Sequence, residues 1–100
     1  MLIKSYPLVL IFDQSIEYVE SAQALQDSLF YLSKKQLKTA IYIDSNEEVY
    51  DLSGDRQNAP SHSVLTTLVQ QKLVSEGQCC TAKIQITQLH QLFSLLKEFS

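Results

Sequence analysis

This 100-residue chain contains two stretches with the same features in the same order, residues 9–21 and residues 40–53. Each has an apolar run, an acidic turn, a second run that alternates and carries a tyrosine, and then a serine. Alternation of this kind is typical of strands, and each copy leads into a helical pattern. A last strand and helix follow. The sequence therefore predicts the element order ββαββαβα.

This order predicts an α+β fold of two layers, because hairpins followed by helices favour an antiparallel sheet with its helices on one face. We expect a five-stranded, mainly antiparallel sheet with three helices on that face, in a single domain spanning residues 1–100. The expected strands lie at 7–12, 16–20, 39–43, 48–52 and 78–86. Strand 7–12 is apolar at both its odd and its even positions, so both of its faces are apolar. This suits a strand covered on both sides or one whose second face meets a partner.

The helices have recognisable start and stop signals. Ser21 is expected to cap a helix that continues to Lys34 and Lys35, whose charges suit its last turn. Pro60 and the serines beside it mark the start of the second helix, which ends at Gly77. The third is expected to begin at Thr87, with an apolar stripe of Leu89, Leu92, Phe93, Leu96 and Phe99.

The charge balance limits the class of partner. The net charge is −3 and there is no basic run, so the sequence lacks the electrostatic footprint of a nucleic-acid or anionic-membrane binder. No segment approaches the roughly 20 apolar residues needed to span a bilayer. The first apolar stretch ends at Asp13 and is too short for a signal peptide. We expect a cytoplasmic protein that binds neither membrane nor nucleic acid.

The two adjacent cysteines are the first chemical candidates. Neighbours on a strand point to opposite faces, so we expect Cys80 to be buried and Cys79 to be partly exposed. Cys79 is also a candidate reactive thiol, although its only helpful neighbour in sequence is Lys83. His62, His90 and the cysteines lack metal-ligand spacing, and the glycines at 54 and 77 cannot build a phosphate loop. We therefore predict no catalytic residue, no metal and no cofactor.

The acidic turns at 13–17 and 44–48 raise the question of calcium. They lack the regular carboxylate spacing and the distal bidentate glutamate of a calcium loop. Solvated turns are the favoured interpretation.

Three segments together resemble a small gammaproteobacterial single-domain family of unknown function. They are Tyr6-Pro7 at the first strand, the hairpin ends Ile-Glu-Tyr-Val-Glu-Ser and Glu-Val-Tyr-Asp-Leu-Ser, and Gly77-Gln78-Cys79-Cys80-Thr81-Ala82-Lys83. The resemblance covers most of the chain. It implies a small α+β fold and brings no assigned activity, cofactor or functional residue.

The leading functional hypothesis is a non-enzymatic module that binds a protein partner or itself. Its expected contact surface is made of tyrosines on the predicted strands, because an exposed apolar patch often marks an interface. Those tyrosines are Tyr6, Tyr18, Tyr42 and Tyr50. One alternative is a redox or thiol protein that works through Cys79. A weak nucleic-acid platform that stacks bases on strand aromatics is another, against which the acidic balance argues.

Overall fold

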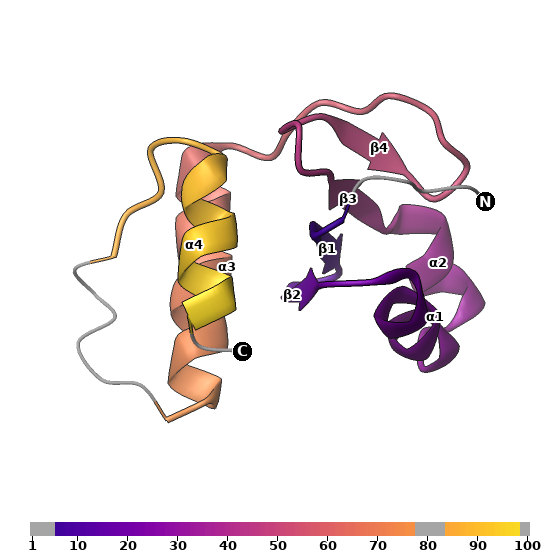
Figure 1. Ribbon diagram of the computed structural model, residues 1–100, viewed down its shortest axis with the longest axis horizontal. Helices are drawn as coiled ribbons and strands as arrows, with labels where there is room; N and C mark the ends of the chain where they lie inside the picture. Colours follow the sequence, from indigo (N-terminus) through magenta and orange to yellow (C-terminus); the bar gives the residue numbers. More distant parts are fainter. Residues whose placement is uncertain (1–5, 78–83, 99–100) are drawn as a thin grey trace.

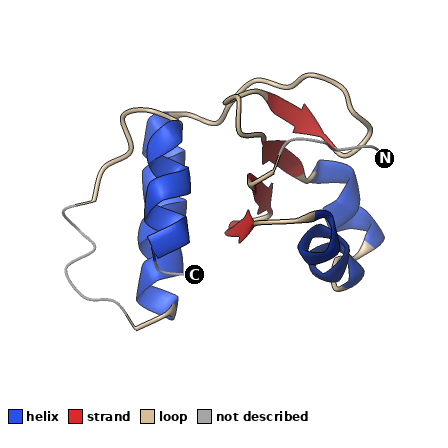
Figure 2. Ribbon diagram, viewed as in Figure 1, coloured by secondary structure: helices blue, strands red, loops and turns tan. Residues whose placement is uncertain are grey.

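The computed structural model describes residues 6–77 and 84–98. These residues form a four-stranded antiparallel sheet with strand order β2-β1-β3-β4 and a pair of helices on each face (Figures 1 and 2). The strands are β1 (Leu8–Phe12), β2 (Ser15–Val19), β3 (Ile41–Ile43) and β4 (Val49–Asp51). The helices are α1 (Ala22–Phe30), α2 (Lys34–Thr39), α3 (His62–Ser75) and α4 (His90–Glu98).

The α+β class and both hairpins are confirmed, but the two-layer arrangement is wrong. The order is ββααββαα, and the helices cover both faces of the sheet: α1 and α2 lie on one face, α3 and α4 on the other (Figure 1). The helices cover both faces because β1 has apolar residues on both of its faces. Leu8 and Leu10 point to one face and Val9 and Ile11 to the other, and all four are buried. Such a strand needs a cover on each side.

Two separate apolar clusters result, one on each face of the sheet. The cluster under α3 and α4 is the larger, and its most buried members are Val9, Ile43, Leu65, Val69 and Leu92. The cluster under α1 and α2 consists of Leu8, Leu10, Val19, Leu25, Ala40 and Tyr42.

The first predicted helix is two helices. Ser21 caps α1 as expected, accepting a hydrogen bond from the Ala24 N–H. The chain then breaks at residues 31–33, because Ser33 and Gln36 form a capping box that starts a new helix: each side chain accepts a hydrogen bond from the backbone N–H of the other. Thr39, expected in a strand, therefore ends α2.

The predicted fifth strand is also wrong where it can be examined. Residues 78–83 lie outside the described residues, but Ile84 to Ile86 form no strand. Their backbone groups bond to side chains of α3 instead: the Ile84 carbonyl accepts from Gln70 Nε2 at 2.9 Å, and the Ile86 N–H donates to Thr66 Oγ1 at 2.8 Å. A segment bonded in this way cannot join a ladder through the same groups.

The outer edge of β4 is closed by the segment that follows it. The Asp51 N–H donates to the Asp55 carbonyl, the Gln57 N–H donates to the Val49 carbonyl, and Tyr50 forms a bridge with Arg56. The Asp51 carboxylate holds this turn by accepting from the N–H groups of Ser53 and Asp55. Those bonds lower the pKa of Asp51.

A long loop, residues 52–61, carries the chain from β4 to the other face of the sheet (Figure 1). Ser61 caps α3 by accepting from the Val64 N–H, and Gly77 follows the helix at φ +82, both as predicted. Thr87 lies before α4 but donates to Gln91 Oε1 instead of capping through its own oxygen. None of the described helices is long and apolar enough to cross a membrane.

Candidate functional site: a groove beside α3

A groove runs between α3 and the β1–β2 hairpin. Its larger part is a cavity of about 510 Å³. Ile11 and Leu68 contribute apolar surface, Asp13 and Gln14 of the hairpin turn form one wall, and Val64 and Thr67 of α3 form the other. Asp13 is held in place by α2, because its Oδ2 accepts a hydrogen bond from Gln36 Nε2 at 2.7 Å.

The groove continues along α3 as a smaller cavity of about 230 Å³. Gln14, Leu68 and Gln71 line both cavities, so the two adjoin, and we call them together the α3 groove. In the smaller part the strand wall is the outer strand β2, with Ser15, Ile16 and Glu17, and the helix wall includes Lys72 and Ser75.

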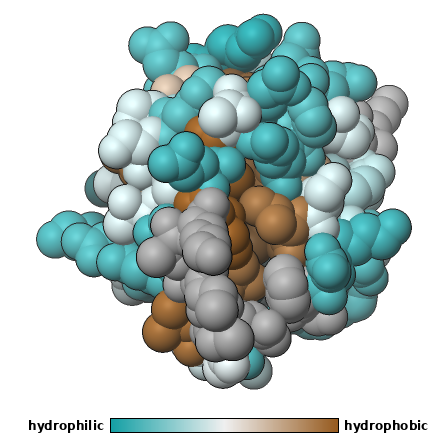
Figure 3. Space-filling view, turned by 90° about the vertical axis from the view of Figure 1, so that its left-hand side faces the viewer, coloured by the Kyte–Doolittle hydropathy of each residue, from teal (hydrophilic) through white to brown (hydrophobic). Residues whose placement is uncertain are grey.

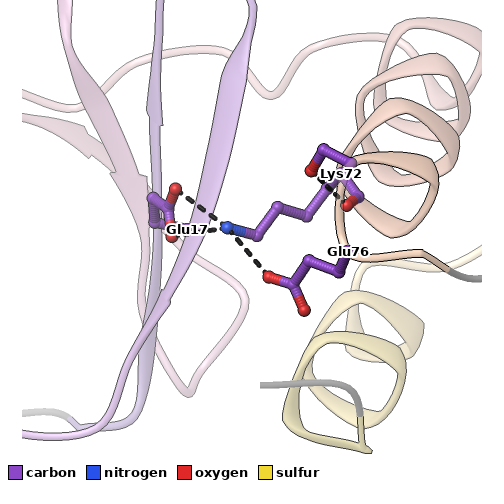
Figure 4. Close-up of polar contacts among 4 residues, drawn as sticks. Glu17, Lys72 and Glu76 are labelled. Carbon is purple, nitrogen blue, oxygen red and sulfur yellow. Dashed lines mark hydrogen bonds and ion pairs between the residues drawn. The ribbon is translucent and has the colours of Figure 1, made fainter.

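Lys72 lies in this smaller part and holds two carboxylates (Figure 4). Its Nζ donates to Glu17 at 2.9 and 3.0 Å and contacts Glu76 Oε1 at 3.3 Å. Burial acts to lower the pKa of Lys72, but the hydrogen bonds and charges of Glu17 and Glu76 outweigh it and raise the pKa above its ordinary value. Lys72 is therefore a firmly protonated link between β2 and α3.

The outer surface of α3 carries two exposed valines. Val64, which lines the groove, is 50% exposed, and Val74 is 59% exposed. On the side of the molecule that α3 and α4 form, apolar side chains gather at the surface (Figure 3). Exposed apolar surface beside a groove is typical of an interaction site.

A family model matches residues 6–96. The chain belongs to the DUF4144 family. The family is described as a protein structure with unknown function, so membership agrees with the predicted resemblance and assigns no chemistry to the groove. The search of the curated proteins and the search of the solved structures each gave no significant match.

The four tyrosines of the predicted interface do not form one surface in this DUF4144 domain. Tyr42 is buried, at 7% exposure, in the cluster under α1 and α2. Tyr6 and Tyr50 pack against the same cluster, whereas Tyr18 packs against the cluster on the opposite face. The Tyr50 hydroxyl also donates to Glu48 Oε2 at 2.6 Å, and Arg56 Cζ lies 5.7 Å from the centroid of the Tyr50 ring. The structure thus brings three tyrosines together near β4 and separates the fourth.

The other predicted residues contribute little to a site. Cys79 and Cys80 lie outside the described residues. His62 begins α3, and His90 Nδ1 lies 4.0 Å from Glu47 Oε1 beside a hollow of about 380 Å³ on α4. Across residues 6–77 and 84–98, no three histidine, cysteine, aspartate or glutamate side chains cluster as a metal site would require.

The DUF4144 domain should lose stability at alkaline pH. Burial raises the pKa of Tyr18 and of Tyr42, the hydrogen bond to Glu48 raises that of Tyr50, and the pKa of Lys72 is raised as well. A raised pKa means that the folded state favours the protonated form, so its stabilisation is complete below about pH 10 and is lost as the pH rises through the folded values. Urea unfolding at pH 8, 10 and 11 should show a falling free energy of unfolding.

The control for this prediction is Tyr42→Phe, which removes one of the titrating groups. Its free energy of unfolding should fall less steeply between pH 10 and pH 11 than that of the wild type. An equal slope in the two proteins would mean that Tyr42 titrates as freely when folded as when unfolded.

Proposed function

We propose that this protein is a binding module that holds a segment of a partner protein in the α3 groove. The observation that carries the proposal is the groove itself, which combines apolar surface from Ile11 and Leu68 with an exposed apolar rim at Val64. Binding sites in proteins are mostly apolar hollows with a few polar groups that fix orientation. Lys72 and Glu17 provide those polar groups.

The side chains of the groove favour binding over catalysis. The hydroxyls of Thr67 and Ser75 donate to backbone carbonyls of their own helix, at 3.1 and 2.6 Å. Two carboxylates hold Lys72 in its protonated form, which removes it as a nucleophile at neutral pH. Among the described lining residues no histidine or cysteine faces the groove as a base or a thiol.

Site-directed photo-crosslinking tests this function. A photo-crosslinking residue in place of Thr67, which lines the groove, should attach covalently to one identifiable protein in cells, at a position that mass spectrometry maps to α3. The same residue in place of Gln26, which is exposed on α1 across the sheet, is the matched control and should not. Equal crosslinking of that protein from both positions would contradict the proposal.

The purified partner then allows a quantitative test with Val64→Asp. We expect about tenfold weaker binding, because a charge would replace apolar surface in the contact. Val64 is half-exposed and lies in the first turn of α3, where an acidic residue suits the helix dipole, so the variant should fold normally. Unchanged affinity for Val64→Asp would exclude the groove as the binding surface.

The remaining expectations from the sequence stay predictions. Self-association would appear in sedimentation as a concentration-dependent mass. A thiol function of Cys79 would appear as fast alkylation at neutral pH that depends on Lys83, and a nucleic-acid platform as binding at low salt. A cytoplasmic location and a gammaproteobacterial family range belong with these predictions.

A further inference from the structure

Among the residues that the structure describes, β2 has the open edge of the sheet. The sheet order makes β2 and β4 the outer strands, and the outer edge of β4 is closed by residues 55–57. Within the described residues, the backbone groups on the outer edge of β2 have no hydrogen-bond partner. An open edge is a template for pairing with another extended chain.

This edge borders the α3 groove. Ser15, Ile16 and Glu17 form the strand wall of its smaller part, and Leu68 and Lys72 face them from α3. A segment that paired with β2 would therefore lie in the groove, alongside the helix. Addition of an extended peptide to a sheet edge obtains its affinity from backbone hydrogen bonds and its specificity from alternate side chains.

The side chains of β2 alternate between the two faces of the sheet. Ile16 and Tyr18 pack against the cluster under α3 and α4, and Val19 belongs to the cluster under α1 and α2. Glu17 pairs with Leu10, which belongs to the same cluster as Val19, so strand alternation places Glu17 on the α1 and α2 side.

The carboxylate of Glu17 nevertheless contacts Lys72 on α3, which covers the opposite face. Because β1 occupies the inner edge of β2, the side chains of Glu17 and Lys72 meet at the outer edge. The ion pair therefore crosses the open edge of β2. A charge placed there is a common means by which proteins protect an edge from unwanted pairing.

We propose that the partner segment binds as an extended strand that pairs antiparallel with β2 and alternates apolar and basic residues. The proposal rests on the proposed function of the groove and names the occupant. In the added strand, the residue opposite Glu17 lies on the same face of the sheet as Glu17. The residues before and after it lie on the other face, where they point towards α3 and Leu68. The pattern that fits is apolar, basic, apolar.

Charge selects the basic residue. Glu17 forms an ion pair with Lys72 at this edge, and Lys72 also contacts Glu76. A strand added at the edge displaces Glu17 from Lys72, which keeps Glu76 as its partner. A lysine or arginine opposite Glu17 then replaces the lost ion pair. A second copy paired symmetrically about Glu17 would instead place two glutamates opposite each other, which is unfavourable.

A synthetic peptide tests this inference with the full chain. The probe is acetyl-Thr-Val-Lys-Val-Thr-amide, titrated to millimolar concentration while amide signals are followed by nuclear magnetic resonance. We expect shifts along β2 and α3, and about tenfold slower hydrogen exchange at amides of β2. Replacing lysine by glutamate in the peptide should weaken binding about fivefold, and Glu17→Gln in the protein about as much. Glu20→Gln, an exposed residue just beyond β2, is the control and should bind normally.

The two proposals fail in different ways. Chemical-shift changes on α3 without slower hydrogen exchange at the β2 amides would overturn strand addition and leave the groove as the binding site. Equal affinity for the lysine and glutamate peptides would overturn the basic specificity. Shifts in neither element, together with failure of the crosslinking experiment, would overturn both proposals.

Discussion

Replacing Leu65 with alanine should lower the free energy of unfolding by about 2–5 kcal/mol. Leu65 lies on α3, is fully buried and belongs to the cluster between that helix and the sheet. The cost has two sources, the lost burial of the side chain and the cavity that the closely packed cluster cannot fill. A domain of this size has a total stability of roughly 5–15 kcal/mol, so the variant should lose a large part of it.

Urea unfolding monitored by circular dichroism measures this loss. Val64→Ala is the matched control, because Val64 is the preceding residue on the same helix and is half-exposed. The control should change the free energy of unfolding by less than about 0.5 kcal/mol. A similar small change for Leu65→Ala would mean that α3 does not pack on the sheet through this face.

Replacing Asp44 with alanine should cost about 1–3 kcal/mol. Asp44 is only 7% exposed, and its Oδ1 accepts hydrogen bonds from the N–H groups of Asn46 and Glu48, both at 2.9 Å. These bonds close the turn between β3 and β4, in which Glu47 has a φ of +64. Alanine leaves both donors without their acceptor, and only the backbone hydrogen bonds of the turn then offset the strain at Glu47.

The variant Asp44→Asn distinguishes the contribution of the hydrogen-bond acceptor at this position from the contribution of the negative charge. Its side-chain oxygen can still accept from both donors, so we expect a loss of less than about 1 kcal/mol, measured by the same urea titration. Equal losses for the alanine and asparagine variants would show that the charge of Asp44, and not its acceptor geometry, stabilises the hairpin.

The local elements were predictable because their signals are local. Both hairpins follow from alternation around acidic turns, and Ser21 and Ser61 cap helices as their positions predict. The apolar character of β1 on both parities already allowed a strand covered on both sides. A single helical layer is nevertheless the simpler prediction, because three amphipathic helices can cover one face of a five-stranded sheet.

The wrong elements depend on partners that are distant or that compete with the local pattern. The pattern of leucines runs through residues 25–32 towards Lys34 and Lys35, and the reciprocal bonds of Ser33 and Gln36 start a second helix there. The alternation that predicted a fifth strand includes Ile84 and Ile86, whose backbone groups bond to Gln70 and Thr66 instead. Tertiary hydrogen bonds of this kind override strand propensity.

The candidate site could not be predicted from the sequence. Glu17 and Lys72 are 55 residues apart and meet only because α3 packs beside β2. Val64 offered a weak signal, since it is an apolar residue outside the core stripe of its helix. The predicted interface was instead based on the tyrosines of the expected strands. Their positions in the sequence do not reveal that Tyr18 and Tyr42 face different helical layers.

The loop at 52–61, which carries the chain to the second face, has a consequence for synthesis. All four strands and their first helical cover are complete by residue 51, whereas α3 begins only at residue 62. If the sheet assembles during synthesis, Val9, Ile11, Ile16 and Ile43 stay uncovered on one side until α3 follows. Transiently exposed apolar strands of this kind are prone to aggregate. Among residues 6–77 and 84–98, every strand therefore precedes α3, and one apolar face of the sheet receives its cover only from the C-terminal part of the chain.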